Sequence, residues 1–126
     1  MLLYVTYGTT DLARARRFYD PTLATLGVVQ LREGRDDFAY GLPGDTDPSF
    51  WIILPFDGKP ATRGNGTMLA LTAPTRAAVD AFHAAALTNG GTDEGAPGIR
   101  YSPTFYSCYV RDPDGNKLSA VCDGPA

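Results

Sequence analysis

Apolar positions along the chain follow two periods, one of about two residues and one of about 3.6 residues. The β-favouring residues of segment 2–8 predict a first strand. The N-cap sequence Thr9-Thr10-Asp11, followed by an apolar stripe with helical spacing, predicts a helix. Because Pro21 removes a backbone donor, we expect it to break this helix and to begin a second short helical piece that ends at Gly27.

The pattern of the first half of the chain returns 64 residues later. Phe18 corresponds to Phe82, Gly27 corresponds to Gly91, and the first strand corresponds to a strand over about 68–73. With two copies only, the repeat cannot be a solenoid, which needs at least about three units to bury its core. We therefore predict two similar modules that each contain a strand, a helix and then further strands.

Turn sequences bound the remaining elements. A second helix is expected from Thr75 to Asn89-Gly90-Gly91. Residues 92–104 are interrupted by glycine and proline, which predicts a long loop. The tetrapeptide Asp112-Pro113-Asp114-Gly115 is typical of a tight turn between strands. The other predicted strands cover 28–33, 38–42, 50–54, 105–111 and 116–122.

We expect one domain over residues 1–126. Its first module covers about 1–56, a glycine- and proline-rich linker covers about 57–67, and the second module covers about 68–124. The predicted fold class is α+β, in which two βαβββ modules pair into a curved eight-stranded mixed sheet with the helices on its outer face.

Strand alternation predicts which side chains face the helices. A turn centred on Asp114 places Val110 opposite Leu118 and Cys108 opposite Ala120, so that one face of the last hairpin is apolar. We expect this face to pack against a helix and the opposite, mixed face to line the concave side of the sheet. The predicted pocket lining is Tyr4, Thr6, Trp51, Met68, Tyr109, Lys117 and Ser119. The alternative is that these side chains fill a second core.

Composition narrows the functional classes. The formal net charge is -3 and no basic stripe is visible, which argues against nucleic-acid binding. No apolar run approaches the roughly 20 residues needed to cross a bilayer, and the N-terminus does not resemble a signal peptide, so we expect a cytoplasmic protein. Cys108 and Cys122 are expected to be small buried hydrophobic residues rather than a disulfide or metal ligands.

An ordered set of short motifs resembles a known family. Asp11-Leu12, Phe18-Tyr19 and Leu26-Gly27 lie in the first module, and Asp112-Pro113-Asp114-Gly115-Asn116 precedes the last strand. In this order and spacing they resemble the vicinal-oxygen-chelate superfamily of glyoxalases, bleomycin-resistance proteins and extradiol dioxygenases. The resemblance covers essentially the whole chain, and it implies the glyoxalase/bleomycin resistance/dioxygenase fold and a homodimer.

Members of that family often hold a divalent metal. The resemblance implies ligand positions early in strand one, at the start of strand five and in the last strand, which here hold Tyr4, Met68 and Ser119. A further position falls near Trp51 or Ile52. None of these side chains suits zinc, iron, nickel or manganese. The one histidine, His83, is expected on the second helix, away from the pocket. We therefore expect no metal and no other cofactor.

The function that this pattern favours is metal-free binding of a small aromatic or amphipathic molecule in the concave pocket. Aromatic walls would supply stacking, while Ser119 and Lys117 would supply polar anchors. One alternative is a lyase, isomerase or dioxygenase of the same superfamily with a non-standard or metal-independent site, in which Tyr4 or Tyr109 acts as acid or base. Another is a structural or regulatory module. The sequence predicts neither catalytic residues nor the identity of the ligand.

Overall fold

The computed structural model describes residues 1–125, and these contain two helices and eight strands. Module one consists of β1 (Val5–Gly8), α1 (Leu12–Ala24), β2 (Val29–Glu33), β3 (Asp37–Gly41) and β4 (Phe50–Ile53). Module two consists of β5 (Leu69–Thr72), α2 (Arg76–Thr88), β6 (Thr92–Ile99), β7 (Phe105–Arg111) and β8 (Lys117–Asp123). This order confirms the α+β class and the two βαβββ modules.

The eight strands form two four-stranded sheets with the same topology. Their strand orders are β1-β4-β3-β2 and β5-β8-β7-β6. In each sheet the first strand of the module pairs in parallel with the last, and the other pairs are antiparallel. Within residues 1–125 no strand pair joins the two sheets, so the edges β1 and β5 are not continued into each other.

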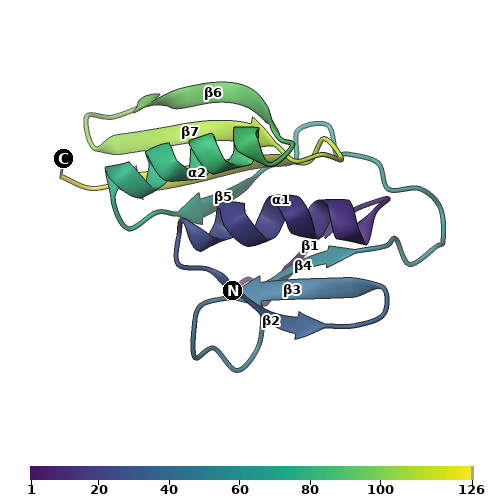
Figure 1. The fold of residues 1–126 in the computed structure, drawn as a ribbon. Coiled ribbons are helices and arrows are strands. Elements are labelled where there is room, and N and C mark those ends of the chain that lie inside the picture. Colours follow the sequence, from purple (N-terminus) through teal and green to yellow (C-terminus); the bar gives the residue numbers. More distant parts are fainter. Residues whose placement is uncertain (126) are drawn as a thin grey trace.

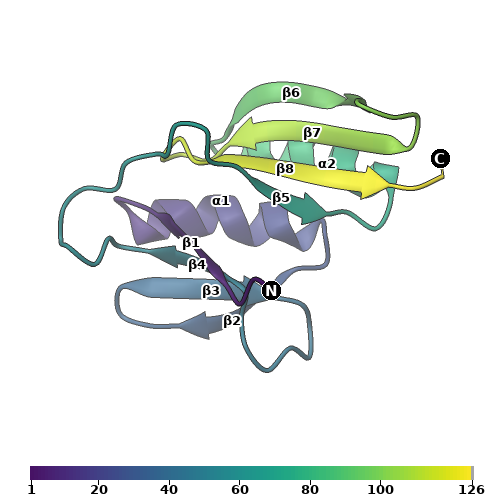
Figure 2. The same ribbon diagram turned by 180° about the vertical axis from the view of Figure 1, so that it is seen from behind.

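The helices lie on the same side of the molecule and join the modules. Figure 1 shows α1 and α2 side by side in front of their sheets, and the two helices contact each other. Figure 2, from behind, shows that the opposite face of each sheet carries no helix. We call these the uncovered faces.

The 64-residue repeat holds through the first strand and the helix of each module. Val5–Gly8 shifted by 64 residues gives Leu69–Thr72, and Leu12–Ala24 shifted by the same number gives Arg76–Thr88. Both helices begin with the expected cap, because the side chains of Asp11 and Thr75 accept hydrogen bonds from backbone amides in the first turn. The modules diverge after the helices.

Alternation places apolar side chains between each sheet and its helix. In the last hairpin Val110 lies opposite Leu118 and Cys108 opposite Ala120, as the turn predicts, and all four are fully buried. In module one the corresponding layer is aromatic. Its largest fully buried members are Phe18, Tyr19, Phe38 and Tyr40.

Pro21 does not break the first helix, so this prediction is wrong. The helix runs without interruption from Leu12 to Ala24 with Pro21 inside it. Proline removes one backbone hydrogen bond, but here it does so near the C-terminal end of the helix. Tyr19 and Leu23 on either side of Pro21 are fully buried, and their packing against the sheet outweighs the lost bond.

The prediction of a loop over residues 92–104 is also wrong for residues 92–99. Residues Thr92–Ile99 form β6, which pairs with β7 through two irregularities, one between Asp93 and Gly95 and one between Gly95 and Gly98. β6 is an edge strand that pairs only with β7. Pro97, which lacks a backbone N–H, is therefore tolerated in it. Glycine and proline therefore mark bulges here, and not a loop.

Candidate functional site

A pocket lies on the uncovered face of module one. Tyr4 and Thr6 extend from β1 and the residues before it, and Trp51 extends from the neighbouring strand β4. Thr6 and Trp51 are register partners in the parallel pair, so alternation directs both away from α1. The pocket has a volume of about 590 Å³. Its other lining residues are Leu3, Asp37, Asp47, Pro48 and Ile53.

The lining of this pocket is mostly apolar with acidic groups. Tyr4 is 55% exposed, so its ring is accessible to a molecule in the pocket. Asp37 and Asp47 contribute the carboxylates, and the nearest cation to Asp47 is Arg32, at 3.9 Å. An apolar wall with a few polar groups is the usual form of a small-molecule site.

A second group of expected site residues lies on the uncovered face of module two. Tyr109 and Ser119 are register partners across β7 and β8, and Lys117 lies two residues before Ser119 on the same face. Two cations lie against the Tyr109 ring. The Arg100 guanidinium carbon is 5.1 Å and the Lys117 ammonium nitrogen 5.4 Å from the ring centroid.

The predicted site residues therefore fall into two sets. Tyr4, Thr6 and Trp51 line one pocket in module one, whereas Tyr109, Lys117 and Ser119 cluster in module two. Met68 immediately precedes β5 and is 44% exposed. The sequence placed Arg100 beside the predicted loop, where it could pair an anionic group, but did not include it in the pocket lining.

The residues at the family's metal-ligand positions do not fit a metal. Tyr4 and Met68 are more than 40% exposed, while Ser119 is fully buried, and none of the three is a strong ligand. Among residues 1–125 no three histidine, cysteine, aspartate or glutamate side chains gather into a metal-binding group. The histidine lies elsewhere, because the His83 Nε2 atom is 2.8 Å from Asp93 Oδ1 at the outer edge of module two.

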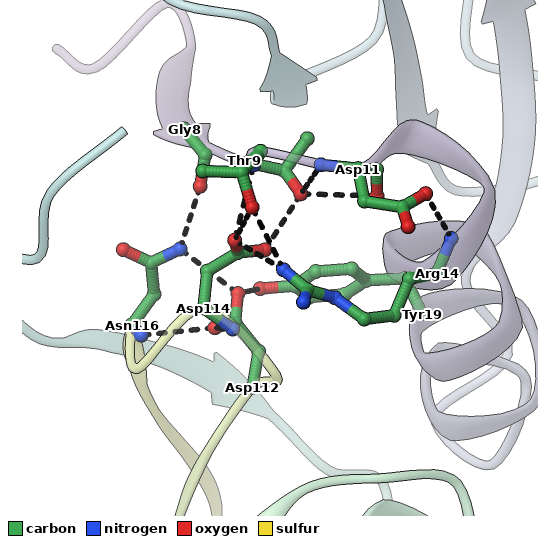
Figure 3. Close-up of polar contacts among 9 residues, drawn as sticks. Gly8, Thr9, Asp11, Arg14, Tyr19, Asp112, Asp114 and Asn116 are labelled. Atoms are coloured by element: carbon green, nitrogen blue, oxygen red, sulfur yellow. Dashed lines mark hydrogen bonds and ion pairs between the residues drawn. The ribbon is translucent and has the colours of Figure 1, made fainter. Parts of the chain in front are cut away.

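A polar junction, which we define as the contact between the 112–116 turn and the start of α1, joins the modules (Figure 3). The Tyr19 hydroxyl and the Asn116 side-chain amide both donate to Asp112 Oδ2. The same amide also donates to the carbonyl oxygen of Gly8, 2.9 Å away. The backbone amides of Asp114 and Asn116 donate to Asp112 Oδ1, which fixes the turn.

Asp114 completes the junction from the same turn. Its carboxylate accepts hydrogen bonds from the Thr9 hydroxyl and from the backbone amide of Thr10, at 2.6 and 3.0 Å. The Arg14 guanidinium forms an ion pair with it at 2.6 Å. The sequence indicated a turn at Asp112 and Asp114, but their partners are about a hundred residues away in the chain. No local signal could identify this role.

Burial perturbs the titration of the junction. Desolvation raises the pKa of Asp112 above its ordinary value, although the hydrogen bonds from Tyr19 and Asn116 oppose this. Desolvation and the neighbouring Asp112 also raise the pKa of Tyr19 well above the usual tyrosine value. Burial raises the pKa of Tyr7 to about 12. These phenols stay protonated as donors, and the Tyr7 hydroxyl donates to the carbonyl oxygen of Lys117.

Within residues 1–125, no helix is both long and apolar enough to cross a membrane. The longest helices, α1 and α2, have thirteen residues each. Thirteen residues rise only about 20 Å along a helix axis, less than the hydrocarbon thickness of a bilayer.

Comparisons with known proteins agree on one family. The sequence model of the Glyoxalase/Bleomycin resistance protein/Dioxygenase superfamily matches residues 2–119. A glyoxalase/bleomycin resistance protein from Albidiferax ferrireducens T118 is 41% identical, with a TM-score of 0.84 and 94% of each chain covered. No curated protein matches the sequence.

More distant solved structures share the fold. A glyoxalase/bleomycin resistance protein/dioxygenase family enzyme from Burkholderia phytofirmans PsJN is 20% identical, with a TM-score of 0.72 and 98% of each chain covered. The fosfomycin resistance protein FosX from Mesorhizobium loti is 18% identical, with a TM-score of 0.67. That match covers 98% of this chain and 92% of FosX.

Proposed function

Because the chain belongs to the glyoxalase/bleomycin resistance protein/dioxygenase superfamily, we propose that it binds a small aromatic or amphipathic molecule on its uncovered faces without a resident metal. The observation that carries the proposal is the pocket formed by Tyr4, Thr6 and Trp51. Its volume of about 590 Å³ lies within the range of roughly 300–1,000 Å³ that is usual for small-molecule sites.

Each part of the site has a physical role in this proposal. Trp51 and Tyr4 offer aromatic surface on which a planar molecule can stack. Thr6 supplies a hydroxyl beside them, while Lys117 and Ser119 supply polar anchors on the uncovered face of module two. The absence of suitable ligands at the family's metal positions supports binding without a metal.

The homodimer and the cytoplasmic location stay predictions. The homodimer is supported by apolar side chains that remain exposed at the start of the chain, where Leu2 and Leu3 are each 78% exposed. It is also supported by the strand edges β1 and β5, which another chain could cover. Light scattering coupled to size-exclusion chromatography distinguishes a monomer of 13.5 kDa from a dimer.

Trp51 is the single tryptophan of the chain, so its fluorescence reports on the proposed pocket. We expect titration with the neutral probe 2-naphthamide to quench this fluorescence to saturation. Calorimetry should then show that Trp51→Ala weakens binding about tenfold or more, the loss expected for an aromatic contact of roughly 1.5 kcal/mol. Phe56→Ala is the matched control, because Phe56 is a fully exposed aromatic residue outside the Tyr4 pocket.

Two results would contradict this function. Equal binding by the wild type and Trp51→Ala would place the aromatic site elsewhere. Stoichiometric metal, measured by elemental analysis after incubation with nickel, zinc, iron and manganese and desalting, would contradict the metal-free site and favour a lyase or dioxygenase. We expect metal well below one equivalent.

A further inference from the structure

The uncovered face of module two carries a group of cations that the proposed function does not explain. We call Arg63, Arg100, Arg111 and Lys117 the cationic cluster. Arg100 and Lys117 lie against Tyr109, and Arg111 forms an ion pair with Glu94. The pKa of Glu94 is lowered, first by its hydrogen bond from Arg111 and then by smaller contributions from Lys117 and Arg63. Arg100 instead acts on the neighbouring Asp93, whose lowered pKa is due mainly to its hydrogen bond with His83 and only in small part to Arg100.

The charge of this region opposes the charge of the whole protein. The chain has a formal net charge of -3, yet this region gathers four cations near two carboxylates, those of Glu94 and Asp93. Among residues 1–125 only Arg111 of the cluster has a carboxylate within 4 Å. Arg100 and Lys117 thus lie against the same ring with no carboxylate within 4 Å of either, and two such charges attract an anion.

Arg100 is held in place by neutral groups. Its guanidinium donates to the carbonyl oxygen of Ala96 at 2.7 Å and to that of Ser107. Carbonyl oxygens orient the side chain but do not neutralise its charge. A guanidinium has five N–H donors, so donors remain for a ligand beyond those that the carbonyls use.

A glycine makes this arrangement possible. Gly95 is the register partner of Tyr109, and a Cβ at this position would lie 2.9 Å from Tyr109 Cδ2 and 3.2 Å from Arg100 Nη2. A larger residue would have to displace the Tyr109 ring or the Arg100 guanidinium. The β6 irregularity at Gly95 therefore leaves room for Arg100 to lie over the Tyr109 ring.

A buried hydroxyl lies beneath the same residues. Ser119 is fully buried, and its Oγ atom has no hydrogen-bond partner among residues 1–125. It lies opposite Tyr109 and on the same face of β8 as Lys117. Buried polar groups in native proteins are nearly always paired, so an unpaired donor beside two unneutralised cations indicates a polar ligand.

We propose that Arg100, Lys117 and Ser119 bind the anionic group of the ligand, either a carboxylate or a phosphate. The inference rests on the proposed function and narrows it from aromatic or amphipathic molecules to aromatic or amphipathic anions. Tyr109 and the adjacent Tyr101, which is 88% exposed, supply apolar surface beside that group. Arg100 is thereby a specificity-determining residue.

Three probes separate the anionic contribution from the aromatic one. These are 2-naphthamide, 2-naphthoate of nearly the same shape with a negative charge, and inorganic phosphate, followed through backbone amide shifts and calorimetry. We expect 2-naphthoate to bind about tenfold more tightly than 2-naphthamide, as a charge-assisted hydrogen bond allows. We expect phosphate to shift the amides of Arg100, Lys117 and Ser119.

Lysine variants test the assignment. Lys117→Gln should remove most of the tenfold preference, and Lys117→Arg should keep it because the charge is retained. Lys59→Gln is the matched control, since Lys59 is the only other lysine and lies exposed in the segment between β4 and β5. Arg100→Gln should have the same effect as Lys117→Gln. Lys117 is the better position to substitute, because the Arg100 side chain also donates a hydrogen bond to the backbone carbonyl of Ala96.

The outcomes distinguish the two proposals. Equal affinity for both naphthyl probes, unchanged by Lys117→Gln, overturns the anion site and leaves aromatic binding intact. Phosphate shifts at the cluster without binding of either naphthyl probe would support the anion site and overturn the aromatic function. A preference for 2-naphthoate that survives Lys117→Gln and is lost in Lys59→Gln also overturns the assignment.

Discussion

Module one and module two place a strand and a helix at the same positions, 64 residues apart, and each leaves one face of its sheet uncovered. On module one that face holds Tyr4 and Trp51 with the carboxylates of Asp37 and Asp47. On module two it holds Tyr109, with Arg100 and Lys117 against its ring. One scaffold thus presents an aromatic and acidic surface in one copy and a cationic surface in the other.

One buried helix position is the same in both modules. Phe18 and Phe82 occupy equivalent helix positions and are both fully buried. Packing against the sheet constrains such positions, whereas the uncovered face tolerates many side chains. The comparison teaches that the repeat keeps a buried phenylalanine at the same helix position, while the side chains on the uncovered faces differ in chemistry.

The largest effect should come from breaking the shared core at equivalent positions. Phe18→Ala and Phe82→Ala should each lower the free energy of unfolding by about 3–5 kcal/mol, because both remove a fully buried ring. Urea denaturation measures both. Leu87→Ala, at a helix position that is 42% exposed, is the control and should have a much smaller effect. A small loss for one phenylalanine alone would mean that the two cores are not equivalent.

The next largest loss of stability is expected at a helix position where the two modules carry different residues. Tyr19 and His83 are equivalent in the repeat, but the Tyr19 hydroxyl donates to a buried carboxylate at the polar junction, while His83 pairs with the exposed Asp93. Tyr19→Phe should cost about 1.5–3 kcal/mol, because it removes a hydrogen bond to a charged group. His83→Phe should cost less than Tyr19→Phe, because the hydrogen bond that it removes goes to the solvent-exposed carboxylate of Asp93.

Denaturation of both variants checks this ordering. The double variant of Tyr19→Phe with Asn116→Ala serves as a further control, since both side chains donate to Asp112 and their effects should not add. Equal losses for Tyr19→Phe and His83→Phe would contradict the special role of the junction.

Substitution of Gly27 or Gly91, which follow the two helices, should lower stability by a smaller amount. Alanine and asparagine should rank in opposite order at the two positions. Gly27 has a φ of +76° with open space around it, whereas a Cβ on Gly91 would lie 2.8 Å from two backbone carbonyl oxygens. At Gly27 asparagine should be milder than alanine, because asparagine tolerates the left-handed region where alanine costs about 1–2 kcal/mol. At Gly91 asparagine should be worse than alanine, because overpacking grows with size.

Thermal or chemical unfolding of these four variants compares the two positions. The same order of asparagine and alanine at both glycines would contradict this distinction. By the 64-residue offset, Gly91 is the counterpart of Gly27 in the sequence. In the structure, however, the glycine with a positive φ after α2 is Gly90, at +99°.

The smallest expected effect is on the pH dependence of stability, to which Asp112 and Glu94 should contribute in opposite directions. The pKa of Asp112 is raised from its ordinary 3.8, so the folded chain holds this proton to higher pH than the unfolded chain does. Its contribution to stability is present below about pH 3.8 and is lost as the pH rises through the folded pKa. Glu94, whose pKa is lowered from 4.5, contributes stability above that pH and loses it as the pH falls through its folded pKa.

Carboxyl carbon shifts measured by NMR during a pH titration test both directions. The stability difference between the wild type and Glu94→Gln should shrink as the pH falls from about 6 to about 3. Asp45→Asn is a control, as it changes a carboxylate of the turn between β3 and β4 that lies apart from the cationic cluster. A pKa below 3.8 for Asp112, or one above 4.5 for Glu94, would contradict these directions.

Local patterns predicted most of the elements. Strand β7 has the expected bounds, and the register of the last hairpin follows from the turn at Asp114. The patterns failed at Pro21 and at β6, where tertiary packing tolerated residues that usually interrupt an element. For the site, Thr6 and Trp51 are register partners in one strand pair, whereas Arg100, which the sequence offered only as a partner for an anionic group beside a loop, directly follows β6.

The sequence by itself determined the α+β class, the two modules and the face to which each strand residue points, because these depend on periods of a few residues along the chain. Only the tertiary structure decided that the sheets stay separate, that Asp112 and Asp114 join the modules, and that Arg100 lies over Tyr109. These features depend on contacts between distant segments or across an irregular strand pair, whose geometry no short-range pattern of apolar residues specifies.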